Sequence, residues 1–337
     1  MRPFSYVRAH DVSEAIREAS SAGAKFIAGG TNILDLMKED VERPMGLIDI
    51  TQLPLNRIET TDQGGLRLGA LVRNSDAAND DRVKDRYPLL ASALLAGASA
   101  QLRNAATIGG NIMQRTRCYY FYDTATDCNK RKPGSGCGAM GGVTRIHAIL
   151  GASDHCIATN PSDMCVALAA LDAEVRVEGS DGERTIPFTE FHRLPGDMPE
   201  LDNVLAPGEL ITAVDLPNET FNTNYTYLKL RDRASYAFAL VSVAAALRLE
   251  NNQIADARLA LGGVAHKPWR DRNAEALLVG KAPERQQFEA IADVVLAAAQ
   301  GQGGNDFKIE LARRAIVRAL QQAADGMPQS QIDKRVA

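Results

Sequence analysis

The sequence predicts an α+β fold built from two or three subdomains. Three observations support this class. The first fifty residues have a βαβ-like order, the part between residues 210 and 261 is dominated by strand-like runs with the spacing of an antiparallel sheet, and the chain ends in two long helical runs. With 337 residues, of which 45% are hydrophobic, the chain can bury a substantial core and is too long for a single simple one.

The predicted N-terminal unit begins with a helix at residues 12–22, where apolar residues recur at helical spacing. A short apolar strand at 25–28 follows, and Gly29 and Gly30 end it. A helical stretch at 32–37 and a strand at 46–50 complete this unit. We therefore expect the first glycine pair to lie between a strand and a helix.

The remaining predicted elements fall in the middle and at the end of the chain. The middle contains a strand at 66–72, a helix at 89–102, a loop at 106–112, a helix at 161–171 and a strand at 173–178. Further strands are expected at 210–216, 225–230, 241–249 and 257–261. Helices at 284–299 and 306–324 flank a glycine-rich connection.

Composition and charge exclude several classes of function. The formal net charge is -4, so the chain has no basic excess that would favour nucleic acid. Neither a secretory signal nor an apolar stretch of about 20 residues is present, so we expect no membrane insertion. Export to the periplasm would then require a signal-bearing partner, and otherwise the chain is cytoplasmic. Hydrolase and NTPase motifs are absent, and we predict no catalytic side chains.

Two glycine turns are candidate sites for an extended phosphate-containing ligand. The first is FIAGGTNI, residues 26–33, and the second is TIGGNI, residues 107–112. Glycines let a diphosphate approach the backbone closely, and the neighbouring Thr and Asn side chains can add hydrogen bonds. Each turn alone is also compatible with an ordinary turn. Neither has the G-x-G-x-x-G spacing of a Rossmann nicotinamide site.

All five cysteines lie within 48 residues, and four of them fall in a segment, residues 115–160, that lacks apolar periodicity. We interpret this segment as an insertion held by a bound group. Cys118, Cys128, Cys137 and Cys156 are separated by 9, 8 and 18 residues, a spacing that does not distinguish an iron-sulfur cluster from zinc. Cys165 lies in a predicted amphipathic helix, next to its apolar stripe, and is expected to be a semi-buried packing residue.

Basic residues and histidines accompany the cysteines. Arg115, Lys130 and their basic neighbours either form a solvated face, offset the charge of a cluster or meet an acidic partner. His147 and His155 are candidate hydrogen-bond donors near a cluster rather than ligands.

The two glycine turns, the NPSD sequence at 160–163, YLKLR at 227–231 and LALGGVAHKPWR at 259–270 resemble the medium FAD subunit of the xanthine dehydrogenase and aldehyde oxidase family, the molybdenum hydroxylases. The resemblance covers essentially the whole chain. It implies a two-subdomain flavin-binding fold of the vanillyl-alcohol oxidase (PCMH) type at 1–220, divided into 1–60 and 61–220, and a C-terminal domain at 221–330 with a three-stranded antiparallel sheet and helices.

The resemblance also implies the residues that contact FAD. By motif these are Lys25, Phe26, Ile27, Ala28, Gly29, Gly30, Thr31, Asn32, Ile33, Thr107, Gly109, Gly110, Asn111, Asp163 and Lys229. Asp163 has an alternative role that needs no cofactor. If Asn160 caps a helix and Pro161 is its first residue, Asp163 stabilises the positive end of that helix.

The cysteine segment resembles that of the aldehyde oxidoreductase branch, which implies a [4Fe-4S] cluster held by the four cysteines of the insertion. The implied function is electron transfer within a heterotrimer, from a molybdenum-cofactor large subunit and a small [2Fe-2S] subunit to FAD and then to an external acceptor. Two alternatives stay open: the FAD subunit of a complex similar to hydroxybenzoyl-CoA reductase, and a zinc-stabilised assembly module without catalytic function.

Overall fold

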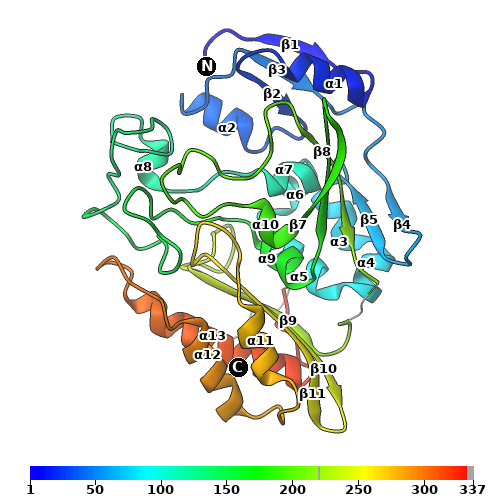
Figure 1. The fold of residues 1–337 in the computed structure, drawn as a ribbon, viewed down its shortest axis with the longest axis vertical. Coiled ribbons are helices and arrows are strands. Elements are labelled where there is room, and N and C mark those ends of the chain that lie inside the picture. The colour runs from blue at the N-terminus through cyan, green and yellow to red at the C-terminus, as the bar shows by residue number, and fades with distance from the viewer. Residues whose placement is uncertain (219–220, 332–337) are drawn as a thin grey trace.

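The computed structural model describes residues 1–218 and 221–331, and three sheets organise it (Figure 1). The N-terminal unit contains β1 (Ser5–Arg8), α1 (Val12–Ala19), β2 (Ala24–Ile27), α2 (Ile33–Lys38) and β3 (Gly46–Asp49). Its strands are parallel in the order β1-β3-β2. This confirms the predicted unit and adds β1, which the sequence pattern did not reveal because all four of its residues are exposed.

The second unit is a five-stranded antiparallel sheet with helices against it. Its strands are β4 (Ile58–Thr60), β5 (Leu66–Gly69), β6 (Glu174–Gly179), β7 (Gly182–Pro187) and β8 (Leu210–Leu216), in the order β4-β5-β8-β6-β7. The helices are α3 (Asn74–Asn79), α4 (Asp81–Arg86), α5 (Pro88–Ala96), α6 (Ala100–Arg103), α7 (Ile108–Ile112), α9 (Asp163–Ala170) and α10 (Phe188–Phe191).

Two local predictions in this unit were wrong. The single helix expected at 89–102 is divided into α5 and α6, because Ala98 adopts a φ of 51° and Ser99 then caps a new helix through Leu102 N. The loop expected at 106–112 contains α7, which Thr107 caps by accepting a hydrogen bond from Gly110 N.

The C-terminal unit is an antiparallel sheet with its own helices on one side. It contains β9 (Tyr225–Leu230), β10 (Val241–Glu250), β11 (Gln253–Gly262) and the two-residue edge strand β12 (Trp269–Arg270), in the order β12-β11-β10-β9. The three long strands were predicted. β11 begins before the expected residue 257, because Asn251 and Asn252 form a tight turn at φ values of 50° and 60°. Helices α11 (Arg272–Leu278), α12 (Arg285–Val295) and α13 (Phe307–Ala324) complete it.

Both faces of the C-terminal sheet are buried. Tyr227, Ala244 and Ala246 belong to the core that α5 and α9 share with the second unit. Val243 and Ala245, which alternate with them, point into the core formed with α12 and α13. The sheet therefore joins the two parts of the chain. The expected domain boundary falls in part on residue 220, which lies outside the described residues.

The cysteine segment, residues 115–160, contains turns, two isolated β-bridges and the short helix α8 (Tyr119–Tyr122). In Figure 1 it lies at one side of the molecule, between α2 and α13. Leu36 of α2 packs into the same apolar cluster as three of the cysteines, and Thr144 Oγ1 donates to Gln302 O at 3.2 Å. No helix among the described residues is long and apolar enough to cross a membrane.

Candidate functional site

The first glycine turn connects β2 to α2. Gly30 adopts a φ of 69°, a conformation that favours glycine. Asn32 precedes α2, and its Oδ1 accepts a hydrogen bond from Arg115 N at 3.0 Å. Its Nδ2 is buried and has no partner within the described parts of the chain. This orphaned donor, beside exposed Gly29 and Thr31, fits an oxygen-rich ligand.

The second turn has a partly structural role. The hydroxyl of Thr107 is buried and already caps α7. Gly109 is packed so closely that an added Cβ would lie 3.1 Å from the Cβ of Ala70, whereas Gly110 is exposed. Thus packing favours glycine at position 109, and Gly110 presents its backbone to the surface.

The structure brings the predicted motifs together. An added Cβ at Gly29 would lie only 1.9 Å from Ala105 O, so the first turn contacts the chain that leads into the second. Asn111 Oδ1 accepts a hydrogen bond from Ser162 Oγ at 2.8 Å, which joins the second turn to the NPSD segment. Three segments far apart in the sequence therefore meet at one place.

Asp163 begins α9 and forms a buried ion pair. One carboxylate oxygen accepts from Tyr227 Oη and the other from Lys229 Nζ, both at 2.7 Å. Lys229 also donates to Ala96 O at 3.2 Å. Burial, together with the Asp163 charge, raises the pKa of Tyr227 well above its ordinary value. The carboxylate and the ammonium thus neutralise one another.

The capping role considered for Asn160 is wrong. Ser162 is the N-cap of α9, since its Oγ accepts from Cys165 N at 3.1 Å. Asn160 instead accepts from Ser162 N through its side chain. Asp163 is the first residue of the helix, and its side chain points to β9 rather than capping the helix.

A cavity of about 400 Å³ opens beside Asp163. The segments that line it are 159–163, Arg117 with Tyr119 and Ile146, and, from the C-terminal unit, 232–233, 237–240, Ser242 and 262–263. The guanidinium of Arg117 lies over the Phe238 ring, 5.0 Å from its centroid. Neither glycine turn nor Lys229 lines this cavity. Of the predicted FAD contacts, Asp163 alone lies on its wall.

The four predicted metal ligands gather in one apolar cluster. Cys118, Cys128 and Cys156 are buried, and Cys137 is half-buried against them. Cys128 and Cys137 face each other in an isolated β-bridge. All are free thiols, and burial raises the pKa of Cys118 to about 12 and that of Cys156 to about 11. Within the described residues, no three His, Cys, Asp or Glu side chains are placed to hold a single metal ion.

The basic residues of this segment do not form a single solvated face. Arg115 Nε and Lys130 Nζ both donate to Asp202, at 2.7 and 2.6 Å. Burial alone would raise the pKa of Asp202, but the charges of Lys130 and Arg115 hold it well below its ordinary value. Arg131 donates to backbone carbonyls of the segment itself, and Lys132 is exposed.

Known proteins match the chain along its length. Residues 2–219 match the family described as the FAD binding domain in molybdopterin dehydrogenase, and residues 225–323 match the CO dehydrogenase flavoprotein C-terminal domain. The chain belongs to the FAD-binding medium subunits of the xanthine dehydrogenase and CO dehydrogenase family.

Individual relatives of this FAD-binding subunit cover nearly all of it. It is 51% identical to the aldehyde oxidoreductase FAD-binding subunit PaoB of Escherichia coli, over 96% of this chain and 99% of that protein. Identity to the glyceraldehyde dehydrogenase medium chain of Sulfolobus acidocaldarius is 29%, over 82% of each chain. A solved carbon monoxide dehydrogenase from Hydrogenophaga pseudoflava matches with a TM-score of 0.76 and 27% identity, over 97% of this chain and 99% of that one.

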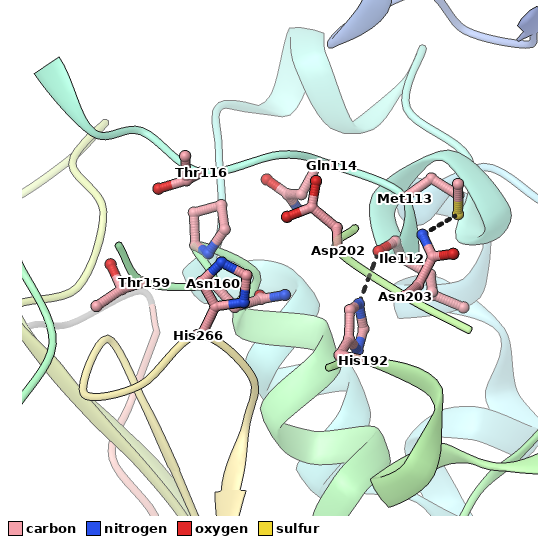
Figure 2. A pocket seen from close by; sticks show the side chains of 11 residues that line it. Ile112, Met113, Gln114, Thr116, Thr159, Asn160, His192, Asp202, Asn203 and His266 are labelled. Carbon is pink, nitrogen blue, oxygen red and sulfur yellow. Dashed lines mark hydrogen bonds between the residues drawn. The ribbon is translucent and has the colours of Figure 1, made fainter. Parts of the chain in front are cut away.

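A second cavity of this FAD-binding subunit, of about 10 Å³, can hold no more than a water molecule (Figure 2). His192, His266 and Asp202 lie around it together with residues that follow the second glycine turn, and His192 Nε2 donates to Ile112 O at 3.0 Å. Burial lowers the pKa of both histidines to about 4. The His192 contact thus supports the last residue of the second turn.

Several residues of the site were not predicted from the sequence. Tyr227 could have been found, because it precedes Lys229 by two residues in a strand and so shares its face. Asp202, Arg233 and Phe238 lie in irregular loops without a motif. Cys165, in contrast, is fully buried within α9, as expected for a packing residue, and burial raises its pKa to about 12.

Proposed function

We propose that this chain is the FAD- and [4Fe-4S]-containing electron-transfer subunit of a molybdenum-dependent aldehyde oxidoreductase. The observation that carries the proposal is the meeting of the two glycine turns with the Asp163 segment, in a chain 51% identical over nearly its full length to an aldehyde oxidoreductase FAD-binding subunit. FAD supplies one- and two-electron transfer when bound, and the protein supplies binding and orientation.

The residues expected to hold FAD fall into two groups, one for the diphosphate and one for the ring system. Residues 25–33, which include the first glycine turn, offer backbone amides and the unpaired Asn32 Nδ2 to a diphosphate. In the second turn, the amides of residues 109–111 already bond within the protein, so Thr107 with 109–111 contributes a close approach of the ligand at exposed Gly110. Asp163 borders a cavity whose volume suits a ring system. Lys229 holds the Asp163 carboxylate in place and keeps it neutralised. The two family matches, residues 2–219 and 225–323, support the proposed boundary near residues 220 and 221 between the FAD-binding part and the C-terminal domain.

We assign a [4Fe-4S] cluster to the four insertion cysteines because their segment resembles the insertion of the aldehyde oxidoreductase branch. A [4Fe-4S] cluster takes one thiolate at each of four irons, so its four sulfur ligands lie near one another without converging on a single point. The four side chains pack in one apolar group: Cys118, Cys128, Cys137 and Cys156. The positive charge of Lys130 lowers the pKa of Cys156, although burial raises it by more. Ligation would deprotonate thiols that burial otherwise keeps protonated.

The assembled enzyme requires partners. Aldehyde oxidation belongs to a molybdenum-cofactor large subunit, a small [2Fe-2S] subunit passes electrons to FAD, and an external acceptor removes them. The chain alone should not oxidise aldehydes. Export together with a signal-bearing partner stays a prediction.

Metal and flavin analysis of the complex, purified anaerobically with its native partners, tests the cluster. We expect FAD, iron and acid-labile sulfide in the wild type, and less iron in C137S with part of the flavin retained. C165S is the matched control and should keep its iron, because Cys165 only packs α9. Zinc without flavin in the wild type would contradict the proposal, as would full iron in C137S.

Flavin content of glycine variants tests the first turn. G29A should lose FAD, because its Cβ would collide with Ala105 O and separate the two turns. G280A is the control, because its Cβ would meet no other atom and its φ of 79° confines the strain to the turn after α11. Stoichiometric FAD in G29A would show that the first turn does not bind the diphosphate. Aldehyde turnover by the assembled complex then distinguishes this function from that of a hydroxybenzoyl-CoA reductase-like subunit.

A further inference from the structure

His147 contacts one of the four cysteines directly. Its Nε2 lies 3.1 Å from the Sγ of Cys118, and both side chains are buried, with 1% and 7% of their surface exposed. The two residues are 29 positions apart, so the contact results from the folding of the cysteine segment rather than from a local turn. No other side chain of the segment has such a contact with a cysteine sulfur among the hydrogen bonds of the described residues.

If Cys118 is a metal ligand, the hydrogen bond between His147 and Cys118 can have only one donor. A thiolate bound to iron carries no proton, so its sulfur can only accept a hydrogen bond. His147 must therefore carry its proton on Nε2 when Cys118 is a ligand. Its Nδ1 is buried and has no partner within residues 1–218 and 221–331, so no competing hydrogen bond holds the ring in the other tautomer.

The C-terminal unit holds His147 in place. Lys308 Nζ donates to His147 O at 2.7 Å and to Gly263 O at 2.6 Å, and Asn305 Nδ2 donates to His147 O at 3.0 Å. Lys308 and Asn305 are fully buried. The position of the imidazole thus depends on the start of α13 and not only on the loop that carries it.

We propose that His147 is a positioning residue for the iron-sulfur cluster: it donates Nε2–H to the Cys118 thiolate and thereby raises the reduction potential of the cluster. This inference rests on the cluster assigned under the proposed function. A hydrogen bond to sulfur stabilises the more negative, reduced form, and such bonds are among the features that set the potentials of iron-sulfur proteins. Cys156 accepts a longer bond, from the backbone N–H of Ala158 at 3.5 Å.

The test compares two substitutions of His147 in the complete complex. H147L removes the donor, and H147Q retains an amide N–H near the position of Nε2. The midpoint potential of the cluster is measured by redox titration followed by electron paramagnetic resonance, together with iron and FAD content. H266Q is the control, because His266 is also a buried histidine but bonds to Arg193 O.

We expect the cluster of H147L to titrate at a more negative potential than the wild type, that of H147Q near the wild type and that of H266Q unchanged. If H147L fails to assemble iron, recovery of iron and potential in H147Q supports the same bond. An unshifted potential in iron-loaded H147L would overturn the inference and leave the proposed function standing, as would H147Q behaving like H147L. A wild-type complex without iron would instead overturn the cluster, and this inference with it.

Discussion

Asp163 begins α9 and places its carboxylate between Tyr227 and Lys229 of β9. Its motif could be recognised in the sequence, but its partners are 64 and 66 residues away. A buried charge of this kind is costly unless it is paired. At the residue scale, therefore, the stability of the site depends on the pair rather than on either member.

Removing the carboxylate should be strongly destabilising. D163A leaves the Lys229 ammonium buried without a counter-charge, and we expect the free energy of unfolding to fall by about 3–5 kcal/mol. The measurement is urea unfolding of the flavin-free chain, so that cofactor release does not contribute. D293A, which breaks the exposed pair with Arg313, should change the free energy of unfolding far less, because solvent screens an exposed pair. Equal losses in the two variants would contradict this account, and D163A combined with K229M should recover part of the loss.

Buried His192 should make the chain sensitive to acid. Its pKa is about 4 in the folded state, against about 6.5 in an unfolded chain. Between these values the unfolded chain binds more protons, so the free energy of unfolding falls as the pH drops from 6.5 to 4. H192Q should lose less stability over this window than the wild type in urea unfolding at each pH. Parallel losses in both proteins would show that His192 does not contribute.

The cysteine segment behaves as an element that polar contacts fix at several points. Asp202 forms ion pairs with Arg115 and Lys130 of the segment, and Arg115 also pairs with Glu42 at 2.5 Å. At the other end, Thr144 and His147 bond to the 302–308 region. These contacts supplement a small apolar cluster, so the segment is ordered even though its sequence lacks helical or strand periodicity.

Weakening the Asp202 contact should loosen this element selectively. D202N leaves the buried Lys130 ammonium without a carboxylate and Arg115 with Glu42 alone, and we expect amide hydrogen exchange across residues 115–160 to speed up by about tenfold or more. Peptides from α12 and α13 should keep their wild-type rates. D197N is the matched control in the same loop, because that side chain is almost fully exposed and pairs with His155 at the surface. Unchanged exchange in D202N would show that other contacts hold the segment.

At the scale of the whole molecule, the C-terminal sheet belongs to two cores at once. One face packs with α5 and α9 of the FAD-binding part, and the other packs with α12 and α13. Separating the two parts would expose an apolar face of the sheet and break the Asp163 pair. The two matched domains are therefore expected to unfold together.

Calorimetry tests this coupling. We expect one unfolding transition for the chain, and a single shifted transition for F288A, since Phe288 is fully buried beneath the sheet and its loss costs about 3–5 kcal/mol. A separate early transition in F288A, with the FAD-binding part melting at its wild-type temperature, would contradict the shared core.

The sequence by itself determined the α+β class, most strands and helices, the glycine turns and the grouping of cysteines. Local periodicity, turn residues and motifs indicate these features, so they can be predicted without knowing which distant residues are in contact. It was less informative at α5 and α6, where Ala98 interrupts the helix, and at β1, whose exposed residues carry no pattern.

Only the tertiary structure decided which groups meet. It paired Asp163 with Lys229, buried Arg115 and Lys130 against Asp202, and placed His147 rather than His155 against Cys118. Each of these pairs joins residues 29 or more positions apart. Such pairing arises from how whole elements pack, because a charge or a thiol acquires its role from the neighbours that burial brings to it.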